Sequence, residues 1–380
     1  MTANAAQTER AHSSNFRHDL LSLRRRMLGF SQTELATAVG ISQGTLSKME
    51  QGLKDVTSAH IDALARALHC PASFFFQIER EYGLPLSMHD GMFRKSASVG
   101  QKAIDKIVAE LNVRISHLRT LLSMVEMETE LPRPVYDVDD FDGNVEEIAQ
   151  NVRRAWLMPR GPVKNLIEYL ERAGIIIIKC DMNGARIDGV SYQIAGLPPI
   201  VFVNSTLPAD RERFTLAHEL GHLVLHRFPV PNMEIEANMF ASAFLMPAAD
   251  ISPDIKNISI ERACALKPYW KVSMGSLIYR AKSLSLIDEG QSQYLWRTMS
   301  FRGYRTREPV SLDFPNEETS IFDALLRNIQ EDLQYSQEDI AQLLHLHFEE
   351  LNQMYRLQKK PVPRRFVWNL TARIHRSGAR

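Results

Sequence analysis

The chain has 380 residues, of which 44% are hydrophobic and 24% charged, an ordinary globular composition that argues against disordered and fibrous proteins. Its 45 lysines and arginines balance 45 aspartates and glutamates, which excludes a uniformly basic nucleic-acid-binding surface but not local basic patches. Three separated cysteines, Cys70, Cys180 and Cys264, indicate reduced thiols and argue against a disulfide framework or a cysteine zinc site. Typical domain sizes predict two or three domains.

No segment of the sequence is long and apolar enough to cross a bilayer. The longest apolar run, residues 174–178, falls far short of the roughly 20 residues that a spanning helix needs. Residues 1–14 are polar, lack the apolar core of a signal peptide and are predicted to be a disordered tail. We therefore expect a cytoplasmic protein without a membrane segment.

Residues 15–77 carry the pattern of a compact helical domain. After a first amphipathic helix, Ser31 and Glu34 are spaced as a capping box that begins a second helix. Gly40 ends that helix, and Ser42 can cap a third. Two short helices joined by a glycine turn are typical of the helix-turn-helix motif.

The third helix has the character of a DNA-reading helix, which enters the major groove. Its outward residues are small or hydrogen-bonding, and we expect them to contact DNA: Ser42, Gln43, Gly44, Thr45, Ser47 and Lys48. Gln43 can pair bidentately with adenine, and Gln32 can hold a phosphate. Arginines 24–26 are expected to add positive charge nearby.

A small helical bundle with a polar face is the alternative, but it does not account for the agreement of caps, turn glycine and apolar spacing. Residues 17–76 resemble the phage-repressor-like Xre/Cro family. The resemblance implies a double-stranded DNA operator as partner. Because one reading helix covers only a half-site, a homodimer is expected.

Two segments of different composition follow. Residues 78–125 are expected to be a helical connector, since apolar residues recur at three- and four-residue steps and predict one long helix over 101–125. The apolar stripe of that helix suits either a dimer interface or the chain's own core. Residues 126–146 are expected to be a solvated acidic linker, because nine acids accompany one arginine up to residue 147.

Residues 147–250 are expected to form a third region that mixes helices with a small sheet. The predicted strands and helices are strands at 174–180, 187–194 and 200–204, and helices ending near 156 and 173 and spanning about 210–227 and 233–246. For the whole chain this predicts a mainly α fold with a small β-sheet, an α+β class.

Within this region the sequence His218-Glu219-Leu-Gly-His222 is an HExxH motif. His218 and His222 stand one helical turn apart, so both imidazoles can bind one Zn²⁺ ion. Glu219 can act as the base that takes a proton from water attacking a peptide carbonyl. Mn²⁺ and Fe²⁺ suit the same donors. A chance match is the alternative, but such matches usually lack the apolar helix side and flanking strands present here.

A catalytic zinc site needs a third protein ligand, which the following helix offers. We expect Glu236, since it precedes the small Ala237 and shares a helix face with Phe240 and Ala243. Glu234 is the second choice. His226, one more turn along the first helix, suits a transition-state donor, or else a capping or surface histidine.

Residues 147–250 resemble the ImmA/IrrE family of metallopeptidases. The resemblance is carried by the stretches from Arg211 to His222 and from Glu236 to Pro247, with Phe244 where leucine is more usual. It implies a gluzincin-like core with two histidines and a glutamate on zinc. Family members without their own DNA-binding domain cleave separate Xre-type repressors.

Residues 251–380 are expected to be a helical C-terminal region with a basic tail. Residues 356–380 hold eight lysines and arginines and no acid, which suits a solvated terminal helix or a supplementary phosphate contact. A weak echo of Ser31-Gln-Thr-Glu-Leu-Ala occurs at Ser336-Gln-Glu-Asp-Ile-Ala. It indicates a second helix-turn-helix-like bundle.

A DNA reader joined to a peptidase suggests a transcriptional regulator controlled by proteolysis. Three hypotheses follow: cleavage of a partner repressor or antitoxin, cleavage of the chain itself, or a non-proteolytic regulator or antitoxin in which the metal site is structural or sensory. An intact Glu219 favours the first two, because a purely structural site needs no base.

Overall fold

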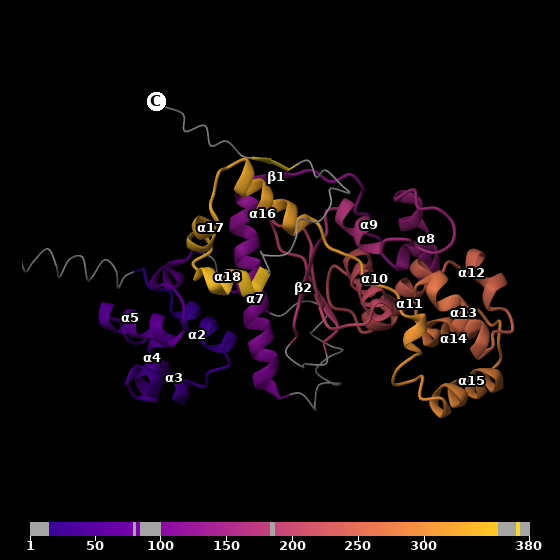
Figure 1. Cartoon of the computed structure of the whole chain (residues 1–380), viewed down its shortest axis with the longest axis horizontal. Helices are drawn as coiled ribbons and strands as arrows, with labels where there is room; N and C mark the ends of the chain where they lie inside the picture. Colours follow the sequence, from indigo (N-terminus) through magenta and orange to yellow (C-terminus); the bar gives the residue numbers. More distant parts are fainter. Residues whose placement is uncertain (1–14, 79–80, 84–99, 183–186, 356–369, 373–380) are drawn as a thin grey trace, which may run out of the picture. The chain divides into compact units, whose positions relative to one another are not determined.

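The computed structural model describes residues 15–78, 81–83, 100–182, 187–355 and 370–372. The chain divides into two compact units (Figure 1). The first unit contains the described residues up to 127 together with those from 323 onward. The second unit contains the described residues between 128 and 322. The chain is mainly helical with a small mixed sheet, so the predicted α+β class is confirmed.

The first unit begins with the predicted helix-turn-helix. Its helices are α2 (His18–Met27), α3 (Gln32–Val39), α4 (Gln43–Glu50) and α5 (Ser58–Ala67), followed by a 3₁₀ turn, η1 (Ala72–Phe76). The capping box of Ser31 and Glu34 is present, and Ser42 accepts a hydrogen bond from the Thr45 amide. Gly40 ends α3 at φ 76°, a left-handed conformation that glycine adopts without a steric penalty.

The long helix predicted after this domain is α7 (Gln101–Ser123). It ends two residues earlier than expected, because strand β1 (Val125–Met127) follows and pairs antiparallel with β5 (Leu370–Ala372). Ala109 and Val113 of α7 are buried in the same apolar cluster as the helix-turn-helix core. This part of the apolar stripe therefore faces the chain's own core, which was one of the two alternatives.

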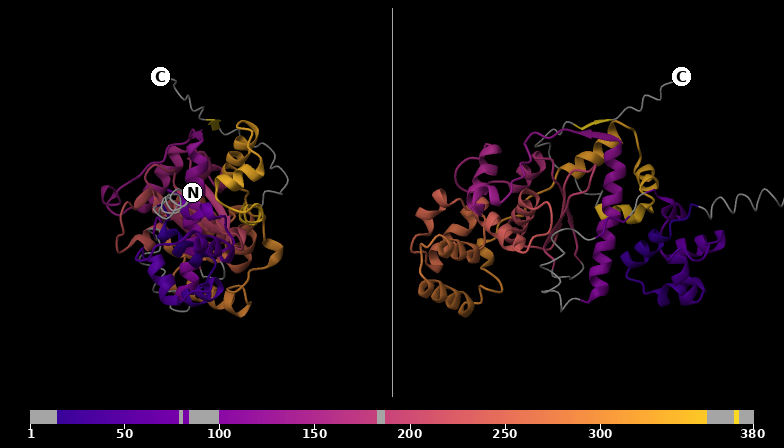
Figure 2. Two further views of the ribbon diagram at one scale, coloured as in Figure 1. Left: turned by 90° about the vertical axis from the view of Figure 1, so that its left-hand side faces the viewer. Right: turned by 180° about the vertical axis from the view of Figure 1, so that it is seen from behind.

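Three helices from the far end of the chain complete the first unit: α16 (Ile321–Glu331), α17 (Gln337–Leu343) and α18 (Phe348–Tyr355). The last of them, α18, lies beside α7 (Figures 1 and 2), where Arg114 of α7 donates to the Met354 carbonyl at 3.0 Å. The unit is thus discontinuous in sequence.

The echo of the first motif has the geometry that the sequence predicts. Ser336 and Asp339 form a capping box at the start of α17. His345 turns the chain at φ 53°, where Gly40 stands in the first motif. Leu351 of α18 is fully buried, as Leu46 of α4 is. The outward positions differ, because Glu349 and Glu350 replace Gly44 and Thr45.

The second unit is built on a three-stranded sheet of order β2-β4-β3: β2 (Ile176–Cys180), β3 (Gly189–Tyr192) and β4 (Ile200–Asn204). β2 runs parallel to β4 and β3 antiparallel to it. β-branched residues dominate β2 and β4 and are buried on both faces, as expected of covered strands. All three strands were predicted.

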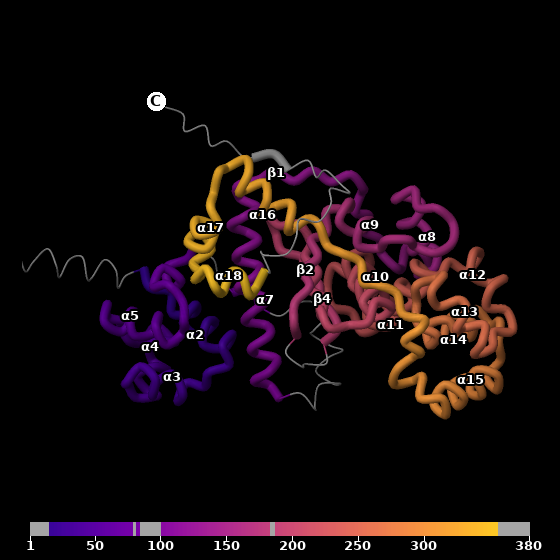
Figure 3. The backbone as a smooth tube through the Cα atoms, in the orientation of Figure 1, coloured from indigo at the N-terminus to yellow at the C-terminus, as the bar shows by residue number. Residues whose placement is uncertain are grey.

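Two helices contact this sheet, α9 (Leu166–Arg172) and α10 (Ala209–Leu225). A third helix, α11 (Met233–Leu245), packs on α10, and α8 (Val145–Ala155) packs on α11. The chain passes from β4 directly into α10 and then turns into α11 (Figure 3). α10 contacts both β3 and β4, and its closest helical neighbour is α11. The two helices that carry the HExxH motif and its expected third ligand therefore lie side by side.

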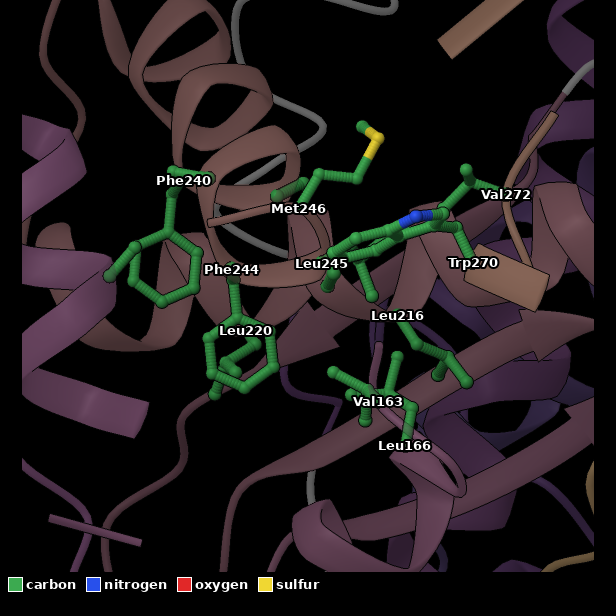
Figure 4. Packing of buried hydrophobic residues seen from close by; sticks show 14 of the residues in the cluster. Val163, Leu166, Leu216, Leu220, Phe240, Phe244, Leu245, Met246, Trp270 and Val272 are labelled. Carbon is green, nitrogen blue, oxygen red and sulfur yellow. The ribbon is translucent and has the colours of Figure 1, made fainter. Parts of the chain in front are cut away.

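The helices that follow share the core of α10 and α11. They are α12 (Ala248–Ile255), α13 (Ile260–Trp270), α14 (Met274–Ser283) and α15 (Glu289–Phe301), with a 3₁₀ turn, η5 (Val310–Leu312). Trp270 and Val272 pack in one cluster with Leu216 of α10 and Leu245 of α11 (Figure 4). The domain boundary expected at residue 250 therefore marks no break in the apolar core.

The acidic segment 126–146 is not fully solvated. Leu131 is buried in the core of the second unit, and the Tyr136 amide donates to the Val224 carbonyl at 2.9 Å. Trp156 donates its indole hydrogen to the Pro132 carbonyl at 2.8 Å. Apolar side chains interspersed among the acids hold the segment to the unit, while most of its carboxylates stay exposed.

The described part of the chain contains no helix with the length and apolar character needed to span a bilayer. The predicted disordered tail, residues 1–14, lies outside the described residues. So does the basic tail from residue 356, apart from 370–372.

Candidate metal centre and nucleic-acid interface

A close approach of α10 and α11 creates the candidate metal centre. Gly221 faces α11, and a Cβ atom there would stand only 3.1 Å from the Cα atom of Ala237. Small residues at the crossing let the two backbones approach, so side chains of α11 reach the histidines of α10.

His218 and His222 aim their Nε2 atoms at one another across 3.0 Å. The Glu234 carboxylate lies beside both, with Oε1 at 3.3 Å from Nε2 of His222 and Oε2 at 3.6 Å from Nε2 of His218. One ligand atom from each residue lies within 4.8 Å of the others. Two imidazoles and a carboxylate are the donor set of a His₂Glu zinc site.

Glu236, which the sequence analysis expected as the third ligand, does not lie beside His218 and His222; it contacts His226. Its Oε2 atom is 2.9 Å from Nε2 of His226, whose Nδ1 is in turn 3.1 Å from Nδ1 of His222. Residues two apart on a helix point about 200° apart, so Glu234 and Glu236 cannot share one partner. The structure brings the second choice, Glu234, to the two HExxH histidines.

Glu219 lies buried at the same site, only 3% exposed. Its Oε2 atom has no hydrogen-bond partner among the described residues. A buried carboxylate oxygen without a partner is costly, and a water molecule on a metal ion held by the neighbouring histidines would satisfy it. The residues present therefore fit a metal centre.

Hydrogen bonds and charges within the cluster favour the charged forms of His218 and Glu234 over their neutral forms. Burial disfavours protonation of His218, but a hydrogen bond that His218 donates to Glu234 and the charges of Glu219 and Glu234 outweigh it and raise the pKa of His218. Burial likewise opposes ionisation of Glu234, yet its hydrogen bonds with His218 and His222 lower the pKa of this carboxyl. Burial lowers the pKa of His226 despite its bond to Glu236.

Buried ion pairs fix the first half of α10. Arg213 pairs with Glu317 and donates to the Val163 carbonyl at 2.6 Å. Glu212 accepts from Lys179 at 2.8 Å, and Asp210 pairs with Lys267. These residues hold the helix that carries the candidate metal centre and take no part in the cluster itself. Sequence spacing alone did not separate these structural charges from the candidate ligands.

The structure presents the predicted DNA-reading residues on and just before α4. Ser42, Gln43, Gly44 and Lys48 are exposed, and Thr45 and Ser47 are partly exposed. Gln43 donates to the Gln32 side chain at 2.7 Å, and Gln32 donates to Glu50 at 2.7 Å. Gln32 therefore bridges the two helices of the motif and orients Gln43.

The expected positive charge of arginines 24–26 is largely neutralised. Arg24 is 1% exposed and pairs with Glu350, while Arg25 pairs with Glu50 and Arg26 with Glu81. The sequence interpretation missed these pairs because the three carboxylates come from distant positions.

Family models match two separate parts of the chain. A helix-turn-helix model matches residues 21–75, and the peptidase M78 model, described as the IrrE N-terminal-like domain, matches residues 170–282. The chain joins an Xre-type helix-turn-helix domain to an IrrE-like domain. The second match takes in the sheet, α10 and α11, and hence the whole candidate metal centre. It extends past residue 250, as the continuous core of the second unit does.

A short part of the chain is also similar to curated proteins. Two uncharacterized HTH-type transcriptional regulators, from Sinorhizobium medicae (strain WSM419) and Rhizobium meliloti (strain 1021), are each 37% identical over 57 residues. That similarity covers 15% of this chain and 41% of each relative, so it spans less than half of their length. No solved structure gives a significant match.

Proposed function

We propose that this protein is a DNA-binding transcriptional regulator whose IrrE-like domain is a metal-dependent peptidase. The observation that carries the proposal is the cluster of His218, His222 and Glu234 beside the buried, unpartnered Glu219. A purely structural metal site has no use for a second acidic side chain that ligates nothing.

His218, His222 and Glu234 would hold the metal, with Zn²⁺ preferred and Mn²⁺ or Fe²⁺ as alternatives. The ion would supply Lewis-acid polarisation of a peptide carbonyl and of the attacking water. Glu234 takes the place that the sequence analysis gave first to Glu236, because its carboxylate accompanies both histidines.

Glu219 would perform the proton transfers. Its burial and its open Oε2 atom suit a base that accepts a proton from water and passes it to the leaving amine of the cleaved peptide. The substrate class is protein: a repressor or antitoxin bound in trans, or the chain itself.

Cleavage can be tested with the purified full chain, its Glu219→Gln variant and an exposed control, Glu147→Gln. Each is freed of metal, reloaded with Zn²⁺ or Mn²⁺, and incubated with Xre-type repressors and antitoxins from the same genome, with and without its own promoter DNA. Intact-mass spectrometry should show metal-dependent fragments with the wild type and Glu147→Gln. Glu219→Gln should bind metal and leave every chain intact.

Two outcomes would refute the peptidase proposal. Fragments that persist in Glu219→Gln would show that another group or a contaminant cleaves. Intact chains throughout, with metal bound, would favour the regulator with a sensory or structural metal site.

DNA binding is proposed through α4, with Gln43 reading a base edge and a homodimer spanning the two half-sites. Gln43→Ala should weaken binding to promoter DNA by about 1–3 kcal/mol, whereas the exposed Ser58→Ala on α5 should not. Fluorescence anisotropy at fixed salt measures both, and sedimentation gives the stoichiometry. Equal affinity of Gln43→Ala and wild type would remove Gln43 from the interface.

A further inference from the structure

The two histidines of the candidate metal centre each have a second ring nitrogen, and both of these nitrogens have partners. Nδ1 of His218 is 3.1 Å from Oδ1 of Asn238. Nδ1 of His222 is 3.1 Å from Nδ1 of His226, and Nε2 of His226 is 2.9 Å from Oε2 of Glu236. The Nε2 atoms of His218 and His222, by contrast, face each other.

A series of hydrogen bonds runs from His222 through His226 to Glu236. The groups at its two ends determine where the protons lie. If Nε2 of His222 binds a metal through its lone pair, the ring proton of neutral His222 must be on Nδ1. That N–H donates to Nδ1 of His226, which must then carry its own proton on Nε2. The second N–H donates to Glu236, an acceptor when ionised. Every donor meets an acceptor, and only one tautomer of each ring fits.

His222 and His226 are buried, so their hydrogen bonds to one another and to Glu236 have no replacement from solvent. His222 is 2% exposed and His226 is 3% exposed. Glu236 stands at the outer end, with 21% of its side chain exposed. Metal-binding histidines commonly donate their other N–H to a fixed acceptor, which sets the tautomer and the ring orientation.

We infer that His226 and Glu236 are positioning residues that hold His222 in the orientation and tautomer required for metal binding. The inference rests on the proposed metal centre and extends it to two residues that ligate nothing. It also gives Glu236 a role at the site other than that of a ligand. Asn238 takes the corresponding place for His218 through a single bond, and its side-chain amide is itself fixed by the Glu234 carbonyl at 2.7 Å.

The test is a set of zinc affinities measured on the full chain by competition with a chromogenic chelator. His226→Ala removes the acceptor for His222 and should weaken zinc binding about 10–100-fold. His226→Asn places an amide oxygen near the lost Nδ1 atom and should recover most of that affinity. Glu236→Ala should weaken binding, whereas Glu236→Gln, which keeps an acceptor oxygen, should lose less. Ile235→Ala is the matched control, since this neighbour on α11 is 61% exposed.

Co²⁺ absorption spectra of the same proteins supply a second measurement, because a misoriented His222 changes the ligand field. We expect altered spectra for the two alanine variants and a spectrum like the wild type for His226→Asn and Ile235→Ala. Circular dichroism of the metal-free proteins checks that each variant is folded.

The possible failures are distinguishable. If the wild type binds no zinc, the metal centre itself is refuted and the inference falls with it. Alanine variants with wild-type affinity and spectra would leave the metal centre standing and refute the positioning role. If His226→Asn loses as much affinity as His226→Ala, packing and not the hydrogen bond would be responsible, which also overturns the inference.

Discussion

Gly189 illustrates how single residues shape the candidate site. A Cβ atom at this position of β3 would lie 2.6 Å from Cγ2 of Thr215, 3.2 Å from the Phe202 carbonyl and 3.6 Å from Cγ of Glu219. Glycine therefore lets the strand pack directly on the helix that carries the base. Its φ angle is not the reason, since Gly189 is absent from the positive-φ residues among those described.

We expect Gly189→Ala to destabilise the second unit by about 1–3 kcal/mol, because the added methyl overpacks this contact. The double variant Gly189→Ala/Thr215→Ser, which lacks the opposing methyl, should recover part of the loss. Urea unfolding followed by tryptophan fluorescence measures this, since Trp156, Trp270 and Trp296 all lie in the second unit.

An exposed glycine provides the contrasting control. Gly44 has no atom within 4 Å of the position of an added Cβ, so Gly44→Ala should show no overpacking. If Gly189→Ala unfolds at the wild-type urea concentration, β3 is not packed on α10 as closely as described.

The sequence predicted only some of the residues that make up the candidate metal centre. HExxH predicted that His218 and His222 share a site because their spacing is one helical turn. The choice between Glu234 and Glu236 depended on the angle at which α11 crosses α10. The helices cross with Gly221 close against Ala237, a tertiary contact that no local spacing encodes.

Between elements, a buried ion pair joins α2 to α18. Arg24 donates to both carboxylate oxygens of Glu350, at 2.6 and 2.8 Å, and to the Leu68 and His69 carbonyls. The guanidinium also lies over the Phe74 ring, 5.5 Å from its centroid. Removal of the carboxylate would leave a buried charge without its counter-ion.

Glu350→Ala is therefore expected to destabilise the first unit by about 3 kcal/mol. Glu349→Ala, the exposed neighbour on the same helix, should change stability by less than about 0.5 kcal/mol. Pulse proteolysis in urea, with fragments assigned by mass spectrometry, reports the unfolding of this unit. A loss equal to that of Glu349→Ala would show that the pair contributes no net stability.

A second contact between elements is sensitive to pH. His117 of α7 lies buried with Nδ1 at 2.8 Å from the Tyr355 hydroxyl of α18, and its Nε2 has no partner among the described residues. Burial, together with the charges of Arg114, Arg24 and His345, lowers the pKa of His117 from 6.5 to about 3.

Because the pKa of His117 is lower in the folded chain than in the unfolded chain, acidification destabilises the fold. Above pH 6.5, His117 is neutral in both states and costs nothing. Below 6.5 the unfolded chain binds a proton that the folded chain excludes, so His117 lowers stability by about 1.4 kcal/mol for each pH unit down to its folded pKa.

We expect the first unit of the wild type to lose stability between pH 6.5 and 5, and His117→Gln to lose about 1.4 kcal/mol per pH unit less. Pulse proteolysis at several pH values measures both slopes. Both proteins keep every other histidine, so the contributions of those residues cancel in the comparison. Parallel slopes would show that His117 titrates alike in both states.

The prediction of elements succeeded where the signal was local. The capping boxes of Ser31 and Ser336, the turn at Gly40 and the β-branched run of β2 are each set by neighbouring residues. The acidic segment was predicted less well. Its charge dominates the composition, but burial of Leu131 and the Trp156 bond to Pro132 depend on the surface it lies against.

At the scale of the whole molecule, the two units differ in continuity. Among the described residues, the second unit is one stretch of chain, 128–322, whereas the first unit combines segments from both ends of the sequence. Arg24 and Arg114 of the first unit each have one partner from the far end of the chain, Glu350 and the Met354 carbonyl.

A fragment spanning residues 128–322 should therefore fold alone and keep the candidate metal centre. A fragment of residues 1–127 should be less stable than the first unit in the full chain, and co-expression with residues 320–380 should restore it. Circular dichroism and size-exclusion chromatography of the three samples test this. A 1–127 fragment as stable as the first unit of the full chain would show that α16–α18 contribute little to it.

The sequence by itself determined the fold class, the helix-turn-helix, the long helix α7, the three strands and the HExxH pair, because each rests on periodicity or spacing within one element. Tertiary structure decided the rest. It brought Glu234 to the histidines and Glu236 to His226, neutralised Arg24 with a residue from the far end of the chain, and placed α18 beside α7. These outcomes depend on how helices cross and pack, and a sequence specifies that only through the complete core.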